Sequence, residues 1–288
     1  MTILEKFTSL AKGKEGNIGI GLGEDKTHNL KILNAALSFI KDNKANTHIF
    51  GDKTQINHLS NEVGYQENKS RITLIKCEDS EDVIIDSLNE GKIDAIVRGS
   101  LSSSKFLKNV KNKLKISEIN RLTLLEAFDG FQFFYGPVGI DECNNFEKKV
   151  AFIKMAIKVL NSLSINPKIS ILSGGRASDA GRDAHVDETI KIAEEVVKHF
   201  KNENSDTSIS ISHDEILIEN AIEKKANLII APEGISGNLI YRTLVHLGSG
   251  KAYGAIYMDI NRIIIDTSRV GKLSEIIGAF KLALALLP

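Results

Sequence analysis

The stretch RIIIDTSRVGKLSEIIGAFKLALALL, residues 262–287, joins a strand pattern directly to a helix pattern. Its first four residues form a short run rich in β-branched side chains, which is typical of a buried strand. Its second half carries apolar side chains at helical spacing. The turn between them holds Ser268 and Arg269, and Glu275 follows early in the helix. Because ligands gather at the carboxyl ends of strands in α/β proteins, we predict an α/β fold with a functional site at this turn.

The same alternation of strands and helices runs along the rest of the chain. Strand patterns cover 17–22, 47–50, 71–75, 93–97, 168–172, 207–211, 227–231 and 252–258; helix patterns cover 28–39, 82–88, 103–114, 146–163, 186–200, 215–225 and 239–247. Such alternation indicates βαβ units and a mainly parallel sheet. Between Arg121–Ala127 and Phe131–Tyr135 only Phe128-Asp129-Gly130 intervenes, which predicts an antiparallel hairpin that opens a second domain.

Composition narrows the classes of function. The chain has 37 basic and 37 acidic residues, so its net charge favours neither nucleic acid nor a membrane surface as a partner. Its two cysteines, Cys77 and Cys143, share no metal-ligand spacing, so we expect neither a metal site nor a disulfide framework. No apolar run reaches the ~20 residues of a membrane helix, and the first residues lack a signal-peptide pattern. We expect a cytoplasmic protein.

Two glycine- or serine-rich loops follow strands in the first half of the chain. Residues 19–27 place three glycines before a helix, so they form either a simple tight turn or a loop whose N–H groups cradle an anion. Residues 98–105 contain Arg98 and Ser100. The serines are either helix caps or, together with Arg98, a site suited to phosphate.

Two more loops of this kind lie in the second half. One contains Ser173, Gly174 and Arg176, in which glycine lets the backbone approach a ligand and arginine offers an anion-binding fork. The other contains Gly237 and Asn238, and we expect Asn238 to cap the following helix. Polar loops at so many strand ends favour a binding cleft between two sheets.

Taken together, the Ser173 loop, the loop with Gly237 and Asn238, and the turn with Ser268 and Arg269 resemble the phosphate acetyl/butyryltransferase family. That family has a Ser-x-x-x-Gly loop after a second-domain strand, then a Pro-x-x-x-x-Gly-Asn-x-x-Tyr-Lys segment, and later an Asp-Leu-Ser-Arg-Gly turn followed by an acid. Here the second segment runs from Pro232 to Arg242, and the turn reads Asp266-Thr267-Ser268-Arg269-Val270 with Glu275 in the acid's place.

The resemblance implies the phosphotransacetylase fold, which is similar to that of isopropylmalate dehydrogenase: two α/β domains with mainly parallel sheets, residues 1–120 plus 262–288 and residues 121–261. It also implies a homodimer and an active site in the interdomain cleft. In the family the serine contacts the thiol of coenzyme A, the arginine holds phosphate and the acid deprotonates the thiol. By position, these catalytic roles would fall on Ser268, Arg269 and Glu275. The expected ligand-binding residues are Arg98, Ser100, Ser173, Gly174, Arg176, Gly237 and Asn238.

Several residues depart from the family pattern. Val270 stands where the family has glycine, Glu275 replaces aspartate, and Arg176 and Arg182 are additional. The family's Gly-x-x-His-Thr-Thr-Ala loop here reads Gly99–Lys105. With these departures the chain resembles a divergent archaeal branch, methanogenesis marker protein 4, described as a methyltransferase subunit of methanogens. The sequence contains no recognisable S-adenosylmethionine or corrinoid motif.

Three hypotheses for function follow. The leading one is a transferase-type protein that binds an anionic or thiol-bearing small molecule, such as coenzyme A or another thiol coenzyme. The second is a phosphate acyltransferase that moves an acyl group between coenzyme A and phosphate. The third is a non-catalytic subunit that binds methyltransferase subunits. The sequence alone does not decide between them.

Overall fold

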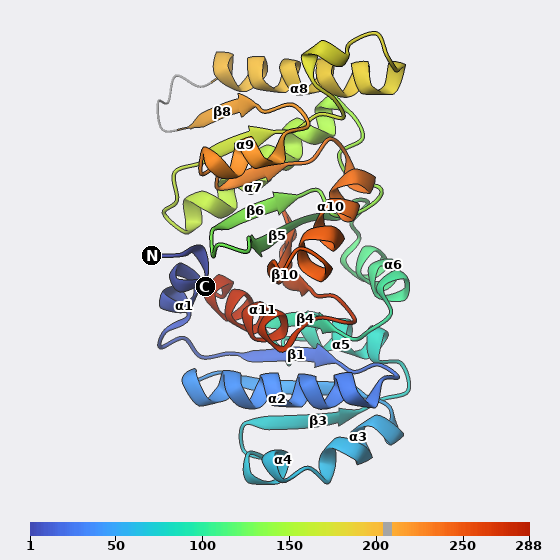
Figure 1. Ribbon diagram of the computed structural model, residues 1–288. Helices are drawn as coiled ribbons and strands as arrows, with labels where there is room; N and C mark the ends of the chain where they lie inside the picture. Colours follow the sequence, from blue (N-terminus) through green and yellow to red (C-terminus); the bar gives the residue numbers. More distant parts are fainter. Residues whose placement is uncertain (204–208) are drawn as a thin grey trace. The chain divides into compact units, whose positions relative to one another are not determined.

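A computed structural model describes residues 1–203 and 209–288, which form two compact units (Figure 1). Unit 1 comprises Met1–Ile119 and Ala252–Pro288, and unit 2 comprises Asn120–Lys251. The return of the chain to unit 1 begins at residue 252, ten residues before the position expected from the sequence. It falls within the strand Lys251–Met258, which pairs with the strand Ile263–Asp266. None of the helices in the described ranges combines the length and apolar character that crossing a membrane requires.

The six strands of unit 1 run in the order β3-β2-β1-β4-β11-β10. Neighbouring strands are parallel except for β10 and β11, which pair antiparallel. The strands are β1 (Asn17–Gly21), β2 (Asn46–Gly51), β3 (Ile72–Lys76), β4 (Ala95–Gly99), β10 (Lys251–Met258) and β11 (Ile263–Asp266). The order reverses between β1 and β4, since the chain moves outward from β1 to β3 and then returns to the other side of β1. Such a switch point is where open α/β sheets bind ligands.

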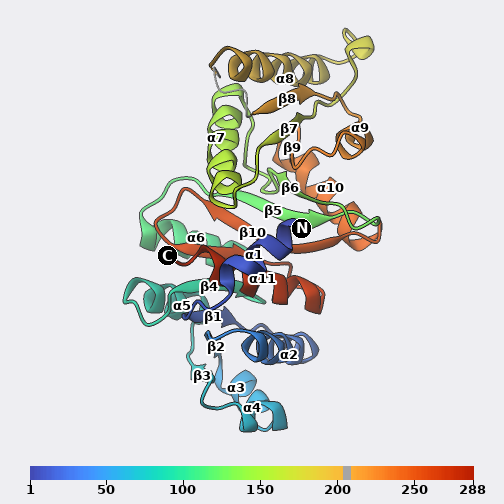
Figure 2. The ribbon, with the colours of Figure 1, turned by 90° about the vertical axis from the view of Figure 1, so that its left-hand side faces the viewer.

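The helices of unit 1 cover both faces of this sheet. They are α1 (Ile3–Ala11), α2 (Lys26–Asp42), α3 (Lys53–Ser60), α4 (Val63–Glu67), α5 (Ser80–Asn89), α6 (Ser103–Leu114) and α11 (Leu273–Leu286). Helix α11 packs against α1 and α2, whereas α5 packs against α6 on the opposite face (Figure 2). The rings of Phe39 and Phe280 stack with their centroids 5.0 Å apart between α2 and α11. Cover on both faces explains why β4 is buried at all five positions.

The five strands of unit 2 run in the order β5-β6-β9-β7-β8. Its strands are β5 (Asn120–Glu126), β6 (Gln132–Gly136), β7 (Lys168–Ile171), β8 (Ser210–His213) and β9 (Leu228–Ile230), and its helices are α7 (Phe146–Ser162), η1 (Ala177–Asp179), α8 (Ala184–Glu203), α9 (Ile218–Glu223) and α10 (Gly234–His246). The predicted hairpin is confirmed: β5 and β6 pair antiparallel, and Gly130 in their turn has a φ of 85°. The other strand pairs are parallel.

The predicted mainly parallel α/β fold is confirmed, with differences at some element ends. Helices α1, α3 and α4 were not predicted; α1 and α3 begin at capping boxes formed by Thr2 with Glu5 and by Asp52 with Gln55. The strand expected at 207–211 is β8, which begins at Ser210, and its predicted start at Thr207 lies outside the described residues. Helix α10 begins at Gly234, five residues before the predicted position.

Candidate functional site

A pocket of about 530 Å³ lies in unit 1 at the carboxyl ends of the parallel strands. Each of the loops that follow five strands contributes to its lining: Gly23 and Glu24 after β1, Asp52 after β2, Glu78 after β3, Ser100 after β4 and Arg269 after β11. The loops after β1 and β4 flank the point where the strand order reverses. The pocket therefore occupies the position at which this kind of sheet binds ligands.

Glycines let the loops after β1 and β4 touch. Gly99 has a φ of 64°, and a Cβ atom there would lie 2.4 Å from the carbonyl oxygen of Gly21. At Gly23 a Cβ atom would lie 2.8 Å from both the Cβ and the carbonyl oxygen of Ser100. Asn29 holds Gly23 in place by donating to its carbonyl at 2.7 Å. The first glycine cluster thus contains a close-packed turn at Gly21 and a pocket-lining residue at Gly23.

Ser100 brings an unused hydroxyl to this pocket. Its side chain is 9 % exposed, and its Oγ has no hydrogen-bond partner among the described residues. Buried hydroxyls are normally bonded, so this one is an exception within the loop that lines the pocket. Ser102 stands at the N-cap of α6, but its hydroxyl makes no capping bond. Instead its backbone N–H donates to Glu81 Oε1 at 2.9 Å.

Arg98 is buried, and its side chain holds two loops of the site together. Its Nε pairs with Asp266 Oδ1, Nη1 donates to the carbonyl of Leu101 at 2.6 Å, and Nη2 donates to the carbonyl of Thr267. Tyr257 donates to the other oxygen of Asp266 at 3.2 Å. The guanidinium, which the sequence suggested as a phosphate ligand, is therefore occupied by protein groups. It ties the end of β4 to the end of β11.

The Ser268-Arg269 turn rests on a buried carboxyl group. Glu275, 2 % exposed in the first turn of α11, accepts a hydrogen bond from the backbone N–H of Ser268 at 2.7 Å. Burial raises the pKa of Glu275 to about 7; the Ser268 bond opposes this rise, nearby Asp266 adds to it, and Arg98 opposes it. Lys31 on α2 also braces the turn by donating to the carbonyl of Gly271 at 3.1 Å. An acid of this kind exchanges its proton near neutral pH.

The three predicted catalytic residues thus come together, with different degrees of exposure. Ser268 is half-buried, and its hydroxyl accepts from the N–H of Val270 at 3.3 Å. Arg269 and Val270 are exposed, and both line the pocket. In the family pattern a glycine follows the arginine. Here an apolar side chain, 66 % exposed, stands at the pocket rim instead.

In unit 2, the hydroxyl of Ser173 in the loop after β7 is bonded to protein groups. The Ser173 hydroxyl donates to the carbonyl of Gly175 at 2.8 Å and is bonded to His213 Nε2 at 2.8 Å. The backbone N–H of Gly174 donates to Thr189 at 2.8 Å. Arg176 is exposed. These bonds fix the loop, and Arg176 and Arg182 are exposed on it.

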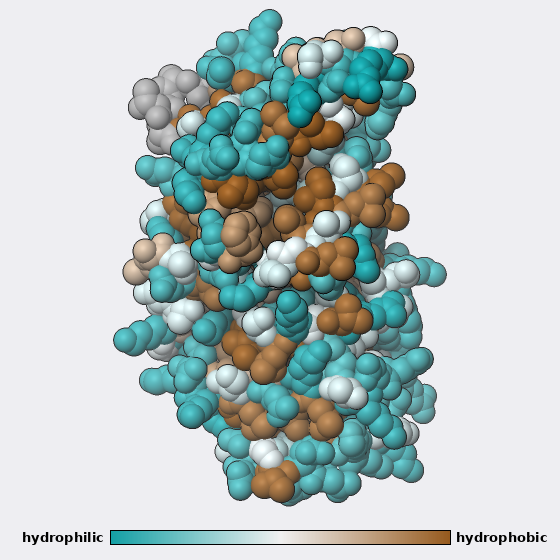
Figure 3. Space-filling view, viewed as in Figure 1, coloured by the Kyte–Doolittle hydropathy of each residue, from teal (hydrophilic) through white to brown (hydrophobic). Residues whose placement is uncertain are grey.

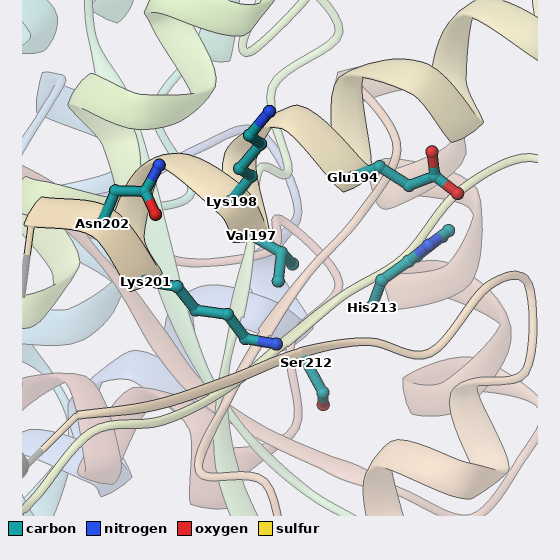
Figure 4. Close-up of a pocket in the computed structure, with 7 residues that line it drawn as sticks. All are labelled: Glu194, Val197, Lys198, Lys201, Asn202, Ser212 and His213. Atoms are coloured by element: carbon teal, nitrogen blue, oxygen red, sulfur yellow. The ribbon is translucent and has the colours of Figure 1, made fainter.

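His213 also lines an open pocket of about 530 Å³ between α8 and β8 (Figure 4). Glu194 lies beside the His213 ring, and the amino group of Lys201 extends toward Ser212 in this view. Burial lowers the pKa of His213, whereas the charges of Glu194, Glu215 and Asp214 raise it. The Ser173–His213 bond therefore lies next to solvent-accessible space, where pH can act on it.

Gly237 and Asn238 lie inside α10, which corrects the expectation of a loop capped by Asn238. Glu233 is the N-cap and accepts from the backbone N–H groups of Ile235 and Ser236. Asn238 donates to the carbonyl of Val138 at 2.7 Å. A Cβ atom at Gly237 would lie 2.0 Å from the carbonyl oxygen of Pro137. Both residues of the family signature thus fasten α10 to the segment after β6.

A buried lysine near this helix had no signal in the sequence. Lys149 on α7 donates to the carbonyls of Ala231 and Pro232 at the end of β9. Burial lowers its pKa to about 8. The hydroxyl of Tyr135 is buried without a hydrogen-bond partner among the described residues. A lysine on the inner face of an amphipathic helix cannot be distinguished from its solvated neighbours by spacing alone.

The fold and the strand-end loops define a class of protein. Residues 84–284 match the family described as phosphate acetyl/butaryl transferase, and the chain belongs to this family. A solved phosphotransacetylase from Streptococcus pyogenes shares the fold, with a TM-score of 0.70 and 16 % identity over 98 % of this chain and 97 % of that one.

Within the family, the chain is similar to proteins of methanogens. It is 35 % identical over 269 residues to the "Putative methyltransferase mtx subunit X" of Methanosarcina mazei, which covers 93 % of this chain and 90 % of the relative. It is 37 % identical over 224 residues to an uncharacterized methyltransferase of Methanocaldococcus jannaschii, covering 75 % and 89 %. The predicted resemblance to the phosphate acetyl/butyryltransferase family and its methanogen branch is confirmed.

Proposed function

We propose that the protein is a group-transfer protein that binds an anionic, thiol-bearing small molecule in the pocket of unit 1. The observation that carries this proposal is the buried Glu275 carboxyl, which is bonded to the backbone of Ser268 beside the pocket-lining Arg269. The names of the methanogen relatives and the family's acyl-transfer chemistry support transfer of a small group.

The proposed chemistry begins with proton transfer. A thiol of pKa about 8.5 becomes a nucleophile when it loses its proton. A carboxylate with a pKa of about 7 is a suitable acceptor near neutral pH, because it is ionised often enough to act and basic enough to accept. Glu275 would take the thiol proton, and Arg269 would hold the anionic part of the ligand. The thiolate then forms the bond to the transferred group, and the donor keeps the electron pair of the bond that breaks.

The lining of the pocket suits a compact thiol better than a polyphosphate. Its five carboxylates belong to Glu24, Asp25, Asp52, Glu78 and Glu81, whereas its single permanent cation is Arg269. Arg98, the other nearby guanidinium, is paired with Asp266. The phosphates of coenzyme A would meet more negative than positive charge here, which disfavours phosphate acyl transfer as the function of this pocket.

Calorimetric titration of the full chain with 3-mercaptopropionate and with coenzyme A tests the proposal. The small thiol should bind, Arg269→Ala should weaken this binding about tenfold, and Glu275→Gln should abolish the ultraviolet absorbance of the bound thiolate while leaving the protein folded. Absence of binding by either thiol to folded protein contradicts the proposal. A coupled assay with acetyl phosphate and coenzyme A decides the acyltransferase alternative, which requires turnover that is lost in Arg269→Ala.

A subunit role is a second candidate, because α10 presents apolar side chains to solvent. Ile235 and Leu239, one turn apart, are 60 % and 61 % exposed, and Leu247 follows at the C-cap. Apolar side chains gather where this helix faces the viewer (Figure 3). Exposed patches of this kind commonly mark protein interfaces. The face suits either a second copy of the chain or a methyltransferase subunit.

Light scattering separates these possibilities. The proposal of self-association expects a dimer for the wild type and a monomer for the double variant Ile235→Gln/Leu239→Gln. Val63→Gln changes an equally exposed apolar residue on α4 and is the matched control. A monomeric wild type removes the homodimer, and the same double variant is then compared with wild type for binding to a purified methyltransferase subunit.

A further inference from the structure

The buried carboxyl group of Glu275 is enclosed by the turn that precedes α11. Its Oε1 accepts the N–H of Ser268 at 2.7 Å. Its Oε2 lies against Gly271, since a Cβ atom at that glycine would be 2.6 Å from this oxygen. The N–H of Gly271 closes the turn by donating to the carbonyl of Ser268 at 3.0 Å. The backbone of residues 268–271 therefore determines how the carboxyl group is held.

A helix distant in sequence holds this turn from outside. The ammonium group of Lys31 on α2 donates to the carbonyl of Gly271, 240 residues further along the chain, at 3.1 Å. Lys31 is half-buried, and Gly271 is buried. Helix α2 packs against α11, where the rings of Phe39 and Phe280 stack. The lysine thus reaches the turn from a helix whose own position is fixed by packing.

Two acids and two cations lie around the turn, and only one pair of them is in direct contact. Asp266 is paired with Arg98. Within residues 1–203 and 209–288, neither Glu275 nor Lys31 makes an ion pair. Burial raises the pKa of Glu275 to about 7, Asp266 adds to this rise, and the charges of Arg98 and Lys31 oppose it. Since the charge of Arg98 is balanced by Asp266, Lys31 is the cation left to stabilise an ionised Glu275.

The buried His28, three residues before Lys31 on α2, adds no second positive charge at neutral pH. Burial lowers the pKa of His28, and the charge of Lys31 lowers it further, whereas the charge of Asp25 raises it. An imidazole with a pKa below its usual value of 6.5 is uncharged at pH 7. The effect of this part of α2 on Glu275 therefore comes from Lys31.

We propose that Lys31 is a positioning residue of the proposed site. Its hydrogen bond to Gly271 keeps the turn closed on the Glu275 carboxyl group, and its charge favours the ionised form that can accept a proton. Lys31 does not line the pocket, so it acts through the turn and not on the ligand. This inference rests on the proposed function, because it names the residue that makes Glu275 a usable base.

Hydrogen exchange of the full chain without ligand at pH 7 tests the hydrogen bond. Lys31→Met keeps most of the alkyl stem and removes the ammonium group. The amides of residues 268–271 should then exchange about fivefold faster, as expected for the loss of one hydrogen bond. Lys31→Arg supplies a donor and a charge again and should return the exchange toward the wild-type rate. Lys41→Met changes an exposed lysine of the same helix and is the matched control.

Urea unfolding at pH 5 and pH 8 tests the charge. Without the charge of Lys31, the pKa of Glu275 in the folded protein rises further above 4.5, so stability falls more steeply as pH increases. Lys31→Met should therefore lower the unfolding midpoint more at pH 8, where Glu275 is ionised in the folded state, than at pH 5. In the Glu275→Gln background the same substitution should give equal losses at both pH values. A lysine with a merely structural role would give equal losses in both backgrounds.

Titration of the complex with 3-mercaptopropionate connects Lys31 to the proposed chemistry. The ultraviolet absorbance of the bound thiolate should increase with pH. Its midpoint should lie at higher pH in Lys31→Met than in the wild type, because a nearby positive charge that favours anions is lost. Lys31→Arg should restore the wild-type midpoint, and Lys41→Met should not move it.

The outcomes separate this inference from the proposed function. Unchanged exchange of residues 268–271 in Lys31→Met overturns the role of the hydrogen bond, and equal losses of stability at pH 5 and pH 8 overturn the role of the charge. Arg269-dependent binding of 3-mercaptopropionate would leave the proposed function standing in both cases. If the thiol does not bind to folded wild-type protein, the proposed function falls, and the two measurements without ligand alone decide whether Lys31 holds the turn and favours ionised Glu275.

Discussion

The turn after β11 and the loop after β7 share a serine, an arginine and a position at a strand end, yet they are built in opposite ways. At Ser268 the bracing group is the buried acid Glu275, which bonds to the backbone and leaves the serine hydroxyl near the surface. At Ser173 the bracing group is the base His213, which bonds to the hydroxyl itself. The first arrangement fixes the backbone of a turn whose Arg269 lines a pocket, and the second uses its hydroxyl to hold a loop.

The largest effect should come from the ion pair beneath the first turn. Arg98→Met leaves Asp266 buried without its charge partner, which should lower the free energy of unfolding by about 3–5 kcal/mol. Arg176→Met in the loop after β7 is the matched control, because that arginine is exposed. Urea unfolding of both variants measures the difference. Equal stability of the two variants would contradict the structural role of Arg98.

The bracing acid should give the next largest effect, and it depends on pH. The pKa of Glu275 is raised on folding from 4.5 to about 7, so between these values the folded state holds a proton that the unfolded state has lost. Stability should therefore fall as pH rises from 4.5 to 7, by on the order of 3 kcal/mol. Glu275→Gln, which cannot ionise, should remove this fall.

Unfolding midpoints in urea at pH 5 and pH 8 measure the fall in stability that Glu275 causes. Glu67→Gln changes an exposed carboxylate of the same unit and should keep the wild-type dependence. An unchanged pH dependence in Glu275→Gln would show that the buried acid does not titrate in this window.

The two serines should separate stability from binding. Ser173→Ala removes a buried hydroxyl that bonds to Gly175 and His213, and should cost about 1–3 kcal/mol. Ser268→Ala should change stability by less than about 0.5 kcal/mol, because its hydroxyl is half-buried and accepts only a long bond from Val270. In titrations with 3-mercaptopropionate the order of the two variants should reverse, and Ser268→Ala should lose more affinity than Ser173→Ala. If Ser173→Ala caused the larger loss in both stability and affinity, the contrast between the two serines would be contradicted.

The smallest expected effect on stability comes from ionisation of His213, which is bonded to the Ser173 hydroxyl. Burial holds the pKa of His213 below 6.5, so under acidic conditions the unfolded state binds a proton that the folded state lacks. This contribution to stability is present above pH 6.5 and is lost as pH falls through the pKa of the folded state, opposite in sign to that of Glu275. His213→Gln should flatten the acid side of the stability profile. Chemical unfolding between pH 5 and 7 tests this, with His185→Gln, an exposed histidine, as the control.

The sequence was sufficient for features set by neighbouring residues. Alternating strand and helix patterns predicted the parallel sheets, and Asp129-Gly130 predicted the hairpin. The Ser268-Arg269 turn was found because a strand runs directly into a helix there. Helix α10 was misplaced because Glu233 caps it, and glutamate is not a favoured N-cap residue.

Other features depend on contacts between distant residues. Arg98 looked like a phosphate ligand because its partner Asp266 is 168 residues away. The raised pKa of Glu275 comes from burial, which spacing does not report. The acidic character of the pocket arises from single carboxylates at separate strand ends, such as Glu24 and Glu78, and becomes visible only when the sheet brings these ends together.

The return of residues 252–288 to unit 1 has a consequence for synthesis on the ribosome. Residues 1–119 precede unit 2 in the chain, but they lack β10, β11 and α11 until residues 252–288 have been made. Unit 2 is continuous and can fold while the first 119 residues still wait for their partners. Domains usually fold in the order in which they are made, and of these two units it is unit 2 that is completed first. The turn that carries Ser268 and Arg269 lies in the returning segment, so the proposed site forms only after residues 1–119 and all of unit 2 have been made.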